Sequence, residues 1–200
     1  MQLADLILNL RLNPAPVKRT GFKSAGENSV AVQSAVLVPI VETNRHELEI
    51  WLTQRPEHLR HHPGQISFPG GKLDSEDTSL YDCALRETRE EIGITPDNWQ
   101  LVSQLSSIST LTGFEISPFV SVSRFQDKKQ PEVTLNKQEV SALIKLPLNA
   151  LLYHLNIQSI EMFRGTDSRL VYGFYFEDKL IWGATAAILN EFKQRLTCQV

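Results

Sequence analysis

Short apolar runs separated by polar turns recur along most of the chain, and this pattern predicts strands. The runs with the length and alternation of strands are residues 34–41, 48–53, 99–103, 116–122, 140–147, 160–163 and 171–176. Helical spacing of apolar residues predicts helices near the N-terminus, before Gly93 and over 185–196. Residues 148–155 fit a short helix or a turn. Because strands and helices do not alternate regularly, we expect an α+β domain.

The N-terminal segment has apolar residues at helical spacing, with Asp5 among them and no basic region ahead: Leu3, Leu6, Ile7 and Leu10. This arrangement is typical of an amphipathic helix packed on a domain and not of a signal peptide. Residues 14–28 contain prolines, glycines and scattered charge, which predicts an arm. We therefore divide the chain into a helix and arm over 1–28 and one domain over 29–200.

Acidic residues are crowded in the run from Arg86 to Ile94. On a helix each residue advances by about 100°, so Glu87, Glu90 and Glu91 share one stripe. Three carboxylates this close repel one another unless a cation lies among them, and Mg²⁺ or Mn²⁺ prefers such oxygen ligands. The alternative is a solvated helix face, which is the usual fate of an acidic run.

The residues around the acidic run favour the metal site. Gly70 and Gly71 precede the helix as a tight turn in which backbone can approach a ligand. We expect Asp77 or Thr78 to cap the helix and Gly93 to end it. The helix also has a largely apolar side for the core, which consists of Leu80, Cys83, Ala84, Thr88 and Ile92.

This segment resembles the Nudix box, G-x5-E-x7-R-E-U-x-E-E-x-G-U, where U is aliphatic. Five residues separate Gly71 from Asp77, which stands where the box has Glu, and eight residues instead of seven precede Arg86. From Arg86 onward the match is complete except for Thr88 at an aliphatic position.

A second motif precedes the box and resembles the signature of the coenzyme A pyrophosphatase branch of the Nudix hydrolases, in which the longer spacing and the Asp are expected. It comprises Leu52-Thr53-Gln54-Arg55, Leu59-Arg60-His61-His62-Pro63-Gly64-Gln65 and Phe68-Pro69-Gly70-Gly71-Lys72-Leu73-Asp74. Trp51 and Pro56 depart from that signature. Pro56 replaces a common Ser and removes a hydroxyl.

The resemblance implies an α/β/α sandwich with a mixed sheet and a Mg²⁺- or Mn²⁺-dependent pyrophosphohydrolase. The implied substrate is coenzyme A, and perhaps its acyl or oxidised forms, with 3′,5′-ADP and 4′-phosphopantetheine as products. The alternatives are hydrolysis of another nucleoside diphosphate derivative, such as ADP-ribose or a dinucleotide, and a non-catalytic binding module. The intact acidic triple argues against the binding module.

The candidate metal ligands are Glu87, Glu90 and Glu91, and analogy with the family adds the Gly70 carbonyl. We expect Arg86 to hold one of these carboxylates in a bidentate ion pair, although it could instead reach a substrate phosphate. The general base is Glu87 or Glu90 in the box, or Glu139 outside it. Glu139 could equally be a solvated residue at the start of a strand.

Phosphate binding is expected from basic residues near the box, because guanidinium groups match phosphate oxygens and Lys offers a compact charge. The candidates are Arg55, Arg60 and Lys72, and the resemblance adds His61. Scattered basic residues on a loop are otherwise simply solvated. Phe114 could stack on adenine, although burial in the core is the commoner fate of a single Phe.

Composition agrees with a soluble enzyme. The 200 residues suit one domain, and the formal net charge of −3 gives no reason to expect nucleic acid as a partner. Two cysteines indicate no disulfide framework and favour a reducing, cytoplasmic location. No run has the apolar length of a membrane span. The sequence leaves the oligomeric state open, with a homodimer as an alternative to a monomer.

Overall fold

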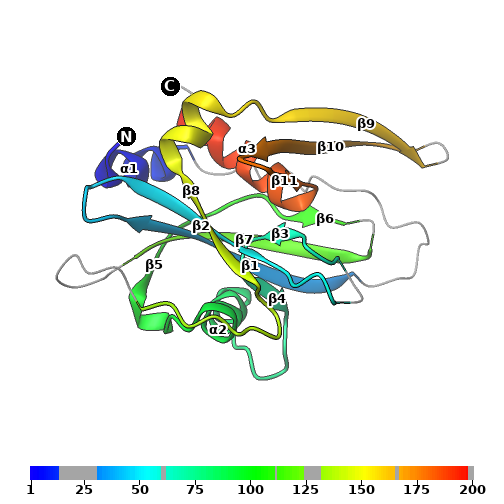
Figure 1. The fold of residues 1–200 in the computed structure, drawn as a ribbon, viewed down its shortest axis with the longest axis horizontal. Coiled ribbons are helices and arrows are strands. Elements are labelled where there is room, and N and C mark those ends of the chain that lie inside the picture. The colour runs from blue at the N-terminus through cyan, green and yellow to red at the C-terminus, as the bar shows by residue number, and fades with distance from the viewer. Residues whose placement is uncertain (14–30, 60–61, 111, 124–131, 165–166, 198–200) are drawn as a thin grey trace.

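A computed structural model describes residues 1–13, 31–59, 62–110, 112–123, 132–164 and 167–197. Its main feature is an eight-stranded mixed sheet in which one strand pair is parallel and the other pairs are antiparallel (Figure 1). The strands are β1 (Val32–Glu42), β2 (Leu48–Gln54), β3 (Ile66–Ser67), β4 (Gly70–Lys72), β5 (Trp99–Gln104), β6 (Ile108–Ser109), β7 (Phe114–Ser123) and β8 (Ala142–Pro147).

Strand β1 lies at the centre of this sheet. It runs parallel to β7, with Val32 opposite Phe114, and antiparallel to β2 and β4. Its apolar residues alternate between two buried clusters, because successive side chains of a strand point to opposite faces. Leu37 belongs to one cluster and Val38 to the other. A nearly continuous apolar run is therefore what a strand covered on both faces requires.

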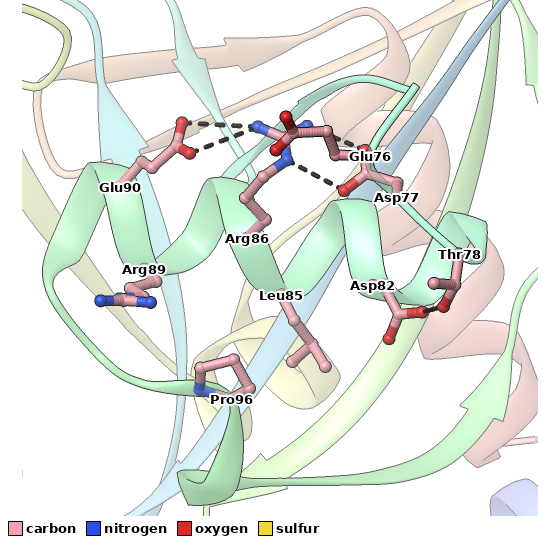
Figure 2. Close-up of a pocket in the computed structure, with 9 residues that line it drawn as sticks. All are labelled: Glu76, Asp77, Thr78, Asp82, Leu85, Arg86, Arg89, Glu90 and Pro96. Carbon is pink, nitrogen blue, oxygen red and sulfur yellow. Dashed lines mark hydrogen bonds and ion pairs between the residues drawn. The ribbon is translucent and has the colours of Figure 1, made fainter. Parts of the chain in front are cut away.

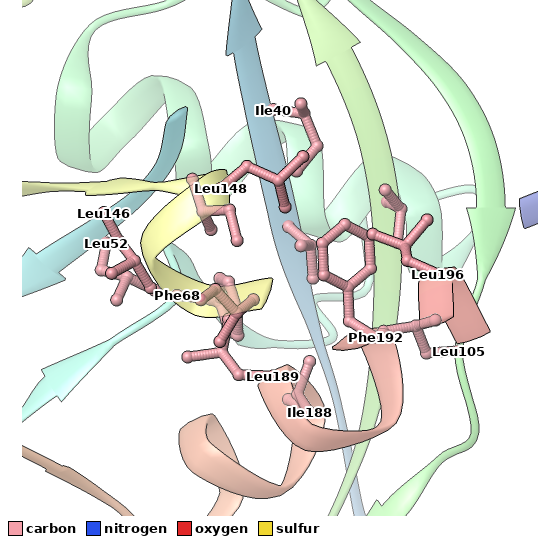
Figure 3. Close-up of a cluster of buried hydrophobic side chains, with 14 of the residues drawn as sticks. Ile40, Leu52, Phe68, Leu105, Leu146, Leu148, Ile188, Leu189, Phe192 and Leu196 are labelled. Atoms are coloured by element: carbon pink, nitrogen blue, oxygen red, sulfur yellow. The ribbon is translucent and has the colours of Figure 1, made fainter. Parts of the chain in front are cut away.

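Helices cover the two faces of the sheet (Figure 1). The helix α2 (Leu80–Ile92) packs on one face, mainly against β1 and β4. On the other face lie α1 (Leu3–Leu12) and α3 (Ala184–Thr197), which contact each other. The core between α3 and the sheet is built from large aliphatic side chains around Phe192 (Figure 3). The fold is thus the expected α+β architecture, an α/β/α sandwich with a mixed sheet.

A second sheet of three antiparallel strands lies on the α3 side. It consists of β9 (Gln158–Arg164), β10 (Asp167–Phe176) and β11 (Lys179–Trp182), in the order β11-β10-β9. One face packs on the core through Phe174 and Ile181, which are buried. The hairpin of β9 and β10 extends beyond α3 (Figure 1).

All seven strands expected from the apolar pattern are present, and the three expected helices form. The short strands β3, β4 and β6 and the strand β11 were not predicted, because two to four residues give too little alternation to recognise. Strand β10 begins four residues before the predicted 171, where the sequence is polar. A single-turn π-helix over Ala150–His154 and a 3-10 turn over Pro96–Asn98 complete the described elements.

The N-terminal helix buries Leu6 and Leu10 in the core on the α3 side. The predicted arm, residues 14–28, lies outside the described residues, and the division of the chain at residue 28 stays a prediction. None of the described helices is long and apolar enough to cross a membrane.

Candidate functional site

The start of α2 differs from the predicted capping. Neither Asp77 nor Thr78 caps the helix. The N-cap is Ser79, whose hydroxyl accepts a hydrogen bond of 3.1 Å from the backbone N–H of Asp82. Sequence alone did not separate these adjacent candidates, because Asp, Thr and Ser are all good N-cap residues. The carboxylate of Asp77 is thereby left for another partner.

The end of α2 is as predicted. Gly93 adopts a left-handed conformation with φ of 78°, and its N–H donates to the carbonyl of Arg89. Next to it, the chain of residues 132–140 runs against the helix end. The N–H groups of Thr134 and Asn136 donate to the carbonyls of Ile92 and Glu91, both at 3.0 Å. These bonds satisfy carbonyls that a helix end otherwise leaves to water.

The prediction of a tight turn at Gly70 and Gly71 is wrong, because both glycines lie in strand β4 and pair with β1. Their missing side chains bring the backbone of β4 close to β1 and α2. A Cβ added to Gly70 would lie 2.3 Å from the carbonyl oxygen of Ala35, on the paired strand β1. A Cβ added to Gly71 would lie 2.4 Å from the carboxylate of Glu87. The Glu87 carboxylate of α2 therefore fills the space that a side chain at Gly71 would occupy.

Arg86 is the centre of an ion-pair network. Its Nε and Nη2 donate to the two carboxylate oxygens of Asp77 at 2.9 and 3.0 Å, which is the bidentate geometry (Figure 2). Its Nη1 donates to Glu87 at 2.8 Å and more weakly to Glu90 at 3.4 Å. Its Nη2 also donates to the Lys72 carbonyl at 3.1 Å. The guanidinium thus ties the loop before α2 to two of the candidate ligands.

The sequence predicted a bidentate ion pair between Arg86 and one of the three box glutamates, and this prediction is wrong. The bidentate partner is Asp77, whose side chain is only 3% exposed. The Arg86 guanidinium lowers the pKa of Asp77 to about 2. The same contacts, with that of Asp77 the strongest, raise the pKa of Arg86 above its usual range. Both groups are charged at neutral pH.

The three glutamates have different surroundings. Glu90 is half exposed, with 52% of its side chain accessible, whereas that of Glu87 is 17% accessible. Glu91 is buried, at 7%. Its Oε1 accepts a hydrogen bond from the Gly70 N–H at 3.4 Å, and its Oε2 has no hydrogen-bond partner within the described residues.

Burial raises the pKa of Glu91 to about 7, against the opposing effects of the Gly70 N–H and the Thr53 hydroxyl. Burial also raises the pKa of Glu87, against the opposing effect of Arg86. The negative charge of Glu139 contributes to both upward shifts, which places this residue near the two glutamates. Glu139 itself is exposed, and its N–H donates to the Asn136 carbonyl at 2.9 Å.

Across the described part of the chain, no three His, Cys, Asp or Glu side chains are gathered into a ready-made cation cage. Glu87 and Glu90 are instead bonded to Arg86, while Glu91 lies against Gly70. A pocket of about 510 Å³ beside α2 includes Arg86 and Glu90 but neither Glu87 nor Glu91 (Figure 2). It therefore does not contain the whole candidate site.

Two of the predicted substrate-binding residues contact each other. The Nζ of Lys72 lies 5.4 Å from the ring centre of Phe114, which is within range of a cation–π contact. Phe114 is half-buried and does not enter the core. Arg55 follows β2, and its carbonyl accepts a hydrogen bond from the Ser141 hydroxyl, two residues after Glu139. The predicted residues Arg60 and His61 lie outside the described residues.

Comparison with known proteins decides the family. The model of the NUDIX domain matches residues 31–165, which is more than half of the chain.

The chain belongs to the Nudix family.

Curated relatives include proteins named as uncharacterized Nudix hydrolase NudL. The protein of Escherichia fergusonii is 36% identical over 161 residues, covering 80% of each chain. That of Yersinia enterocolitica is 36% identical over 165 residues, covering 82% of this chain and 80% of the relative. Their names give no substrate.

Similar solved structures include a Caenorhabditis elegans Ap4A hydrolase in a binary complex, with 18% identity and a TM-score of 0.47 over 56% of this chain and 78% of that one. Another is the NUDIX domain of Shewanella oneidensis NrtR with ADP ribose, with 19% identity and the same TM-score over 62% of this chain and 78% of that one. Similarity at this level carries no argument about substrate.

The Nudix motif explains which residues sequence reasoning found and which it missed. It led directly to the box glutamates, because the motif names them. It did not reveal that Asp77 is the main partner of Arg86, since a residue nine positions earlier lies outside any helical spacing. The position itself was a usable signal, because Asp77 stands at the box position of an acidic residue.

Gly71→Ala tests whether the close approach of β4 to α2 positions Glu87. The three atoms nearest to the new Cβ all belong to the Glu87 carboxylate, which the Cβ would push away. We expect hydrolase activity to fall about a hundredfold or more, while the melting temperature changes little. Gly173→Ala is the control, because its Cβ would make only an ordinary 3.5 Å contact with Trp182. Equal activity in the two variants would contradict the positioning role of Gly71.

Proposed function

We propose that this Nudix protein is a cytoplasmic, Mg²⁺- or Mn²⁺-dependent pyrophosphohydrolase that cleaves the diphosphate of coenzyme A. The observation that carries the proposal is the Glu91 carboxylate. It is buried, has one oxygen without a hydrogen-bond partner among the described residues, and lies beside the Gly70 backbone with Glu87 one helical turn away. A buried carboxylate so poorly satisfied destabilises the fold, which is typical of a functional site.

The residues fit a divalent cation. Glu87, Glu90 and Glu91 would hold it through oxygen atoms, with the Gly70 carbonyl as a further ligand. The Oε2 of Glu91 has no partner among the described residues, and burial raises the pKa of both Glu87 and Glu91, so their negative charge is incompletely compensated. When bound, such a cation neutralises diphosphate charge and lowers the pKa of a water.

Arg86 acts in this proposal as a positioning residue. Its bidentate bond to Asp77 fixes the guanidinium against the loop before α2. The fixed guanidinium then orients Glu87 through the 2.8 Å bond. All three nitrogens of Arg86 already donate within the protein, to Asp77, Glu87, Glu90, Lys72 and Cys83. Contact with a substrate phosphate is therefore the weaker alternative.

Proton abstraction from the attacking water is assigned to Glu139, with Glu87 and Glu90 as the alternatives within the box. Glu139 is exposed, while its charge acts on Glu87 and Glu91. It therefore combines access to solvent with proximity to the candidate metal ligands. Its backbone is also held, because the preceding segment is bonded to the end of α2.

Coenzyme A is proposed as the substrate because the motif before the box resembles that branch of the family. Lys72 and Phe114 form one candidate surface for the nucleotide, where a cation and a ring face are adjacent. Arg55, Arg60 and His61 would bind phosphate groups from the neighbouring loop. Coenzyme A carries a 3′-phosphate beside its diphosphate, and this additional charge is what a basic loop would recognise.

The assay that tests the proposal compares coenzyme A, dephospho-coenzyme A, ADP-ribose and a dinucleoside polyphosphate. We expect the highest kcat/KM for coenzyme A, with 3′,5′-ADP released. EDTA should abolish activity, and added Mg²⁺ or Mn²⁺ should restore it. If ADP-ribose or a dinucleotide were hydrolysed faster than coenzyme A, that nucleoside diphosphate derivative would be the substrate instead. Absence of turnover with every substrate and metal would indicate a binding module.

A further inference from the structure

A second pocket, of about 460 Å³, lies where the three-stranded sheet meets the end of β2. The main sheet contributes Gln54, the last residue of β2, and the adjoining loop contributes Gln65. Strand β11 contributes Leu180 and Trp182. Small-molecule sites are typically hollows of about 300–1,000 Å³ in which apolar walls surround a few polar groups. The pocket has the size and the composition of such a site.

The pocket opens on the face of the main sheet away from α2. Along β2, Trp51 belongs to the buried cluster on the α2 side and Leu52 to the cluster on the α3 side. Because successive side chains of a strand alternate, Thr53 faces α2 and Gln54 faces the pocket. Thr53 is also the residue whose hydroxyl acts on Glu91. The pocket and the candidate metal site therefore lie on the two faces of the same strand end.

Gly70 lies between this pocket and the proposed nucleotide surface. Where β1 and β2 no longer pair with each other, β3 pairs with β2 and β4 with β1. Gly70 begins β4 on one side of β1, and Phe114 begins β7 on the other. Lys72 lies on the same face as Val36, the partner of Gly70, which packs on the α3 side. A diphosphate held beside Gly70 would have the nucleotide surface on one side and the pocket on the other.

Hydrogen bonds hold the two walls of the pocket together. Thr185, three residues after Trp182, is buried, and its hydroxyl donates to the Ile66 carbonyl at 3.2 Å. The N–H of Arg55 donates to the Gln65 carbonyl at 3.0 Å. These bonds preorganise the pocket, and a preorganised site loses less entropy when a ligand binds.

The lining suits an uncharged chain that carries amide groups. Leu180 and Trp182 form an apolar wall and are 46% and 45% exposed. The side-chain amides of Gln54 and Gln65 can each donate and accept hydrogen bonds, which is what the amides of a ligand require. An apolar wall beside two amides therefore matches a chain in which apolar segments alternate with amides.

The charges along the pocket do not favour a phosphate group. Asp178 and Lys179 both line it, at the turn that leads into β11, and their side chains approach to 3.9 Å. A phosphate would meet the Asp178 carboxylate as well as the Lys179 ammonium group, and like charges repel. A nucleotide that carries a 3′-phosphate is therefore the less suitable occupant.

We propose that this pocket binds the half of the diphosphate substrate that is remote from the nucleotide, and that the bound group is an uncharged, amide-bearing chain. In coenzyme A this group is the pantetheine arm. The proposal rests on the proposed function, because the diphosphate has to lie at Gly70 and the box glutamates. It assigns a role in substrate specificity to Leu180 and Trp182, which are remote from the box in the sequence.

Acrylamide quenching of tryptophan fluorescence tests the proposal, with 4′-phosphopantetheine and 3′,5′-ADP as probes. Trp51 and Trp99 are 1% and 5% exposed, so quenching reports mainly on Trp182. Trp182→Phe measures how much of the quenched signal belongs to this residue. We expect saturating 4′-phosphopantetheine to lower the quenching constant of the wild-type chain by about half, because a pocket covers most of its ligand. We expect 3′,5′-ADP to leave that constant unchanged.

Steady-state kinetics gives a second measurement. Trp182→Ala and, independently, Leu180→Ala should raise KM for coenzyme A about tenfold with little change in kcat, because they remove binding that substrate and transition state share. Circular dichroism should stay unchanged, since both side chains are about half exposed. Tyr153→Ala is the control, because Tyr153 is 67% exposed and is not one of the residues that line the pocket.

Three results would overturn the proposal: no shielding of Trp182 by 4′-phosphopantetheine, shielding by 3′,5′-ADP instead, or an unchanged KM in both alanine variants. The quenching measurement separates this proposal from the proposed function. Shielding by 4′-phosphopantetheine in a protein that does not hydrolyse coenzyme A would contradict the proposed function and support the pocket assignment. Hydrolysis of coenzyme A without shielding would contradict the pocket assignment alone.

Discussion

Glu91→Gln is expected to lower kcat for the diphosphate substrate by roughly a thousandfold, because a buried cation ligand loses its charge. The fold should persist, since Gln has the same shape and can still accept the Gly70 N–H. Steady-state kinetics at saturating Mg²⁺ measures the loss. Glu47→Gln, at an exposed turn of the β1–β2 hairpin, is the matched control and should keep normal activity. Near-normal turnover in Glu91→Gln would remove Glu91 from the site.

The same substitution should stabilise the metal-free protein. Glu91 has a pKa of about 7 in the folded chain and an ordinary value of 4.5. The folded state therefore binds the proton more tightly, and stability is lost as pH rises from about 4.5 through 7. Removing the charge should restore roughly 2–3 kcal/mol at pH 8. Thermal melts in EDTA at pH 5 and pH 8 should show a gain for Glu91→Gln that is much larger at pH 8. An unchanged or lower melting temperature at pH 8 would contradict the strain attributed to this carboxylate.

Arg86→Gln is expected to be the most destabilising single change in the candidate site. It would leave Asp77, whose side chain is 3% exposed, without its bidentate partner. Truncating one member of a covered ion pair costs about 3 kcal/mol. Urea unfolding of Arg86→Gln against Arg89→Gln, an exposed position on the same helix, measures this loss. Activity should fall as well, because Glu87 and Glu90 lose the group that orients them. Equal stability of the two variants would contradict the central role of Arg86.

The pH dependence of this ion pair has a definite sign. Asp77 has a pKa of about 2 in the folded chain and an ordinary value of 3.8, so its stabilisation is complete above about pH 4 and is lost as pH falls toward 2. We expect Asp77→Asn to cost about 2 kcal/mol at pH 7 and progressively less below pH 4. A difference between wild type and Asp77→Asn that stays constant from pH 7 to pH 2.5 would show that the Asp77 charge is not responsible.

Sequence reasoning was most successful where one residue type has one physical consequence. Gly93 marked the helix end because few other residues adopt its conformation without strain, and the apolar run of residues 34–41 marked the strand β1. It was least successful where several residues are chemically equivalent. Ser79, Thr78 and Asp77 are all capable N-caps, and the choice depends on Arg86, which attracts the carboxylate.

The candidate site shows the same limit. Helical spacing places Glu87, Glu90 and Glu91 on one side of α2 but does not say that Glu91 is buried and Glu90 exposed. That difference comes from the sheet beneath the helix, including strand β4 at Gly70, which is a tertiary feature.

The parallel pairing of β1 with β7 has a consequence for synthesis on the ribosome. Val32 pairs with Phe114, which is 82 positions later. The central strand β1 therefore lacks its parallel partner β7 until that long stretch of chain has been synthesised. Until then α2 has no complete surface on which to dock. Nascent chains arrested before β7 should consequently be cleaved by a protease within residues 80–92 of α2. Chains that are long enough to include β7 should resist this cleavage.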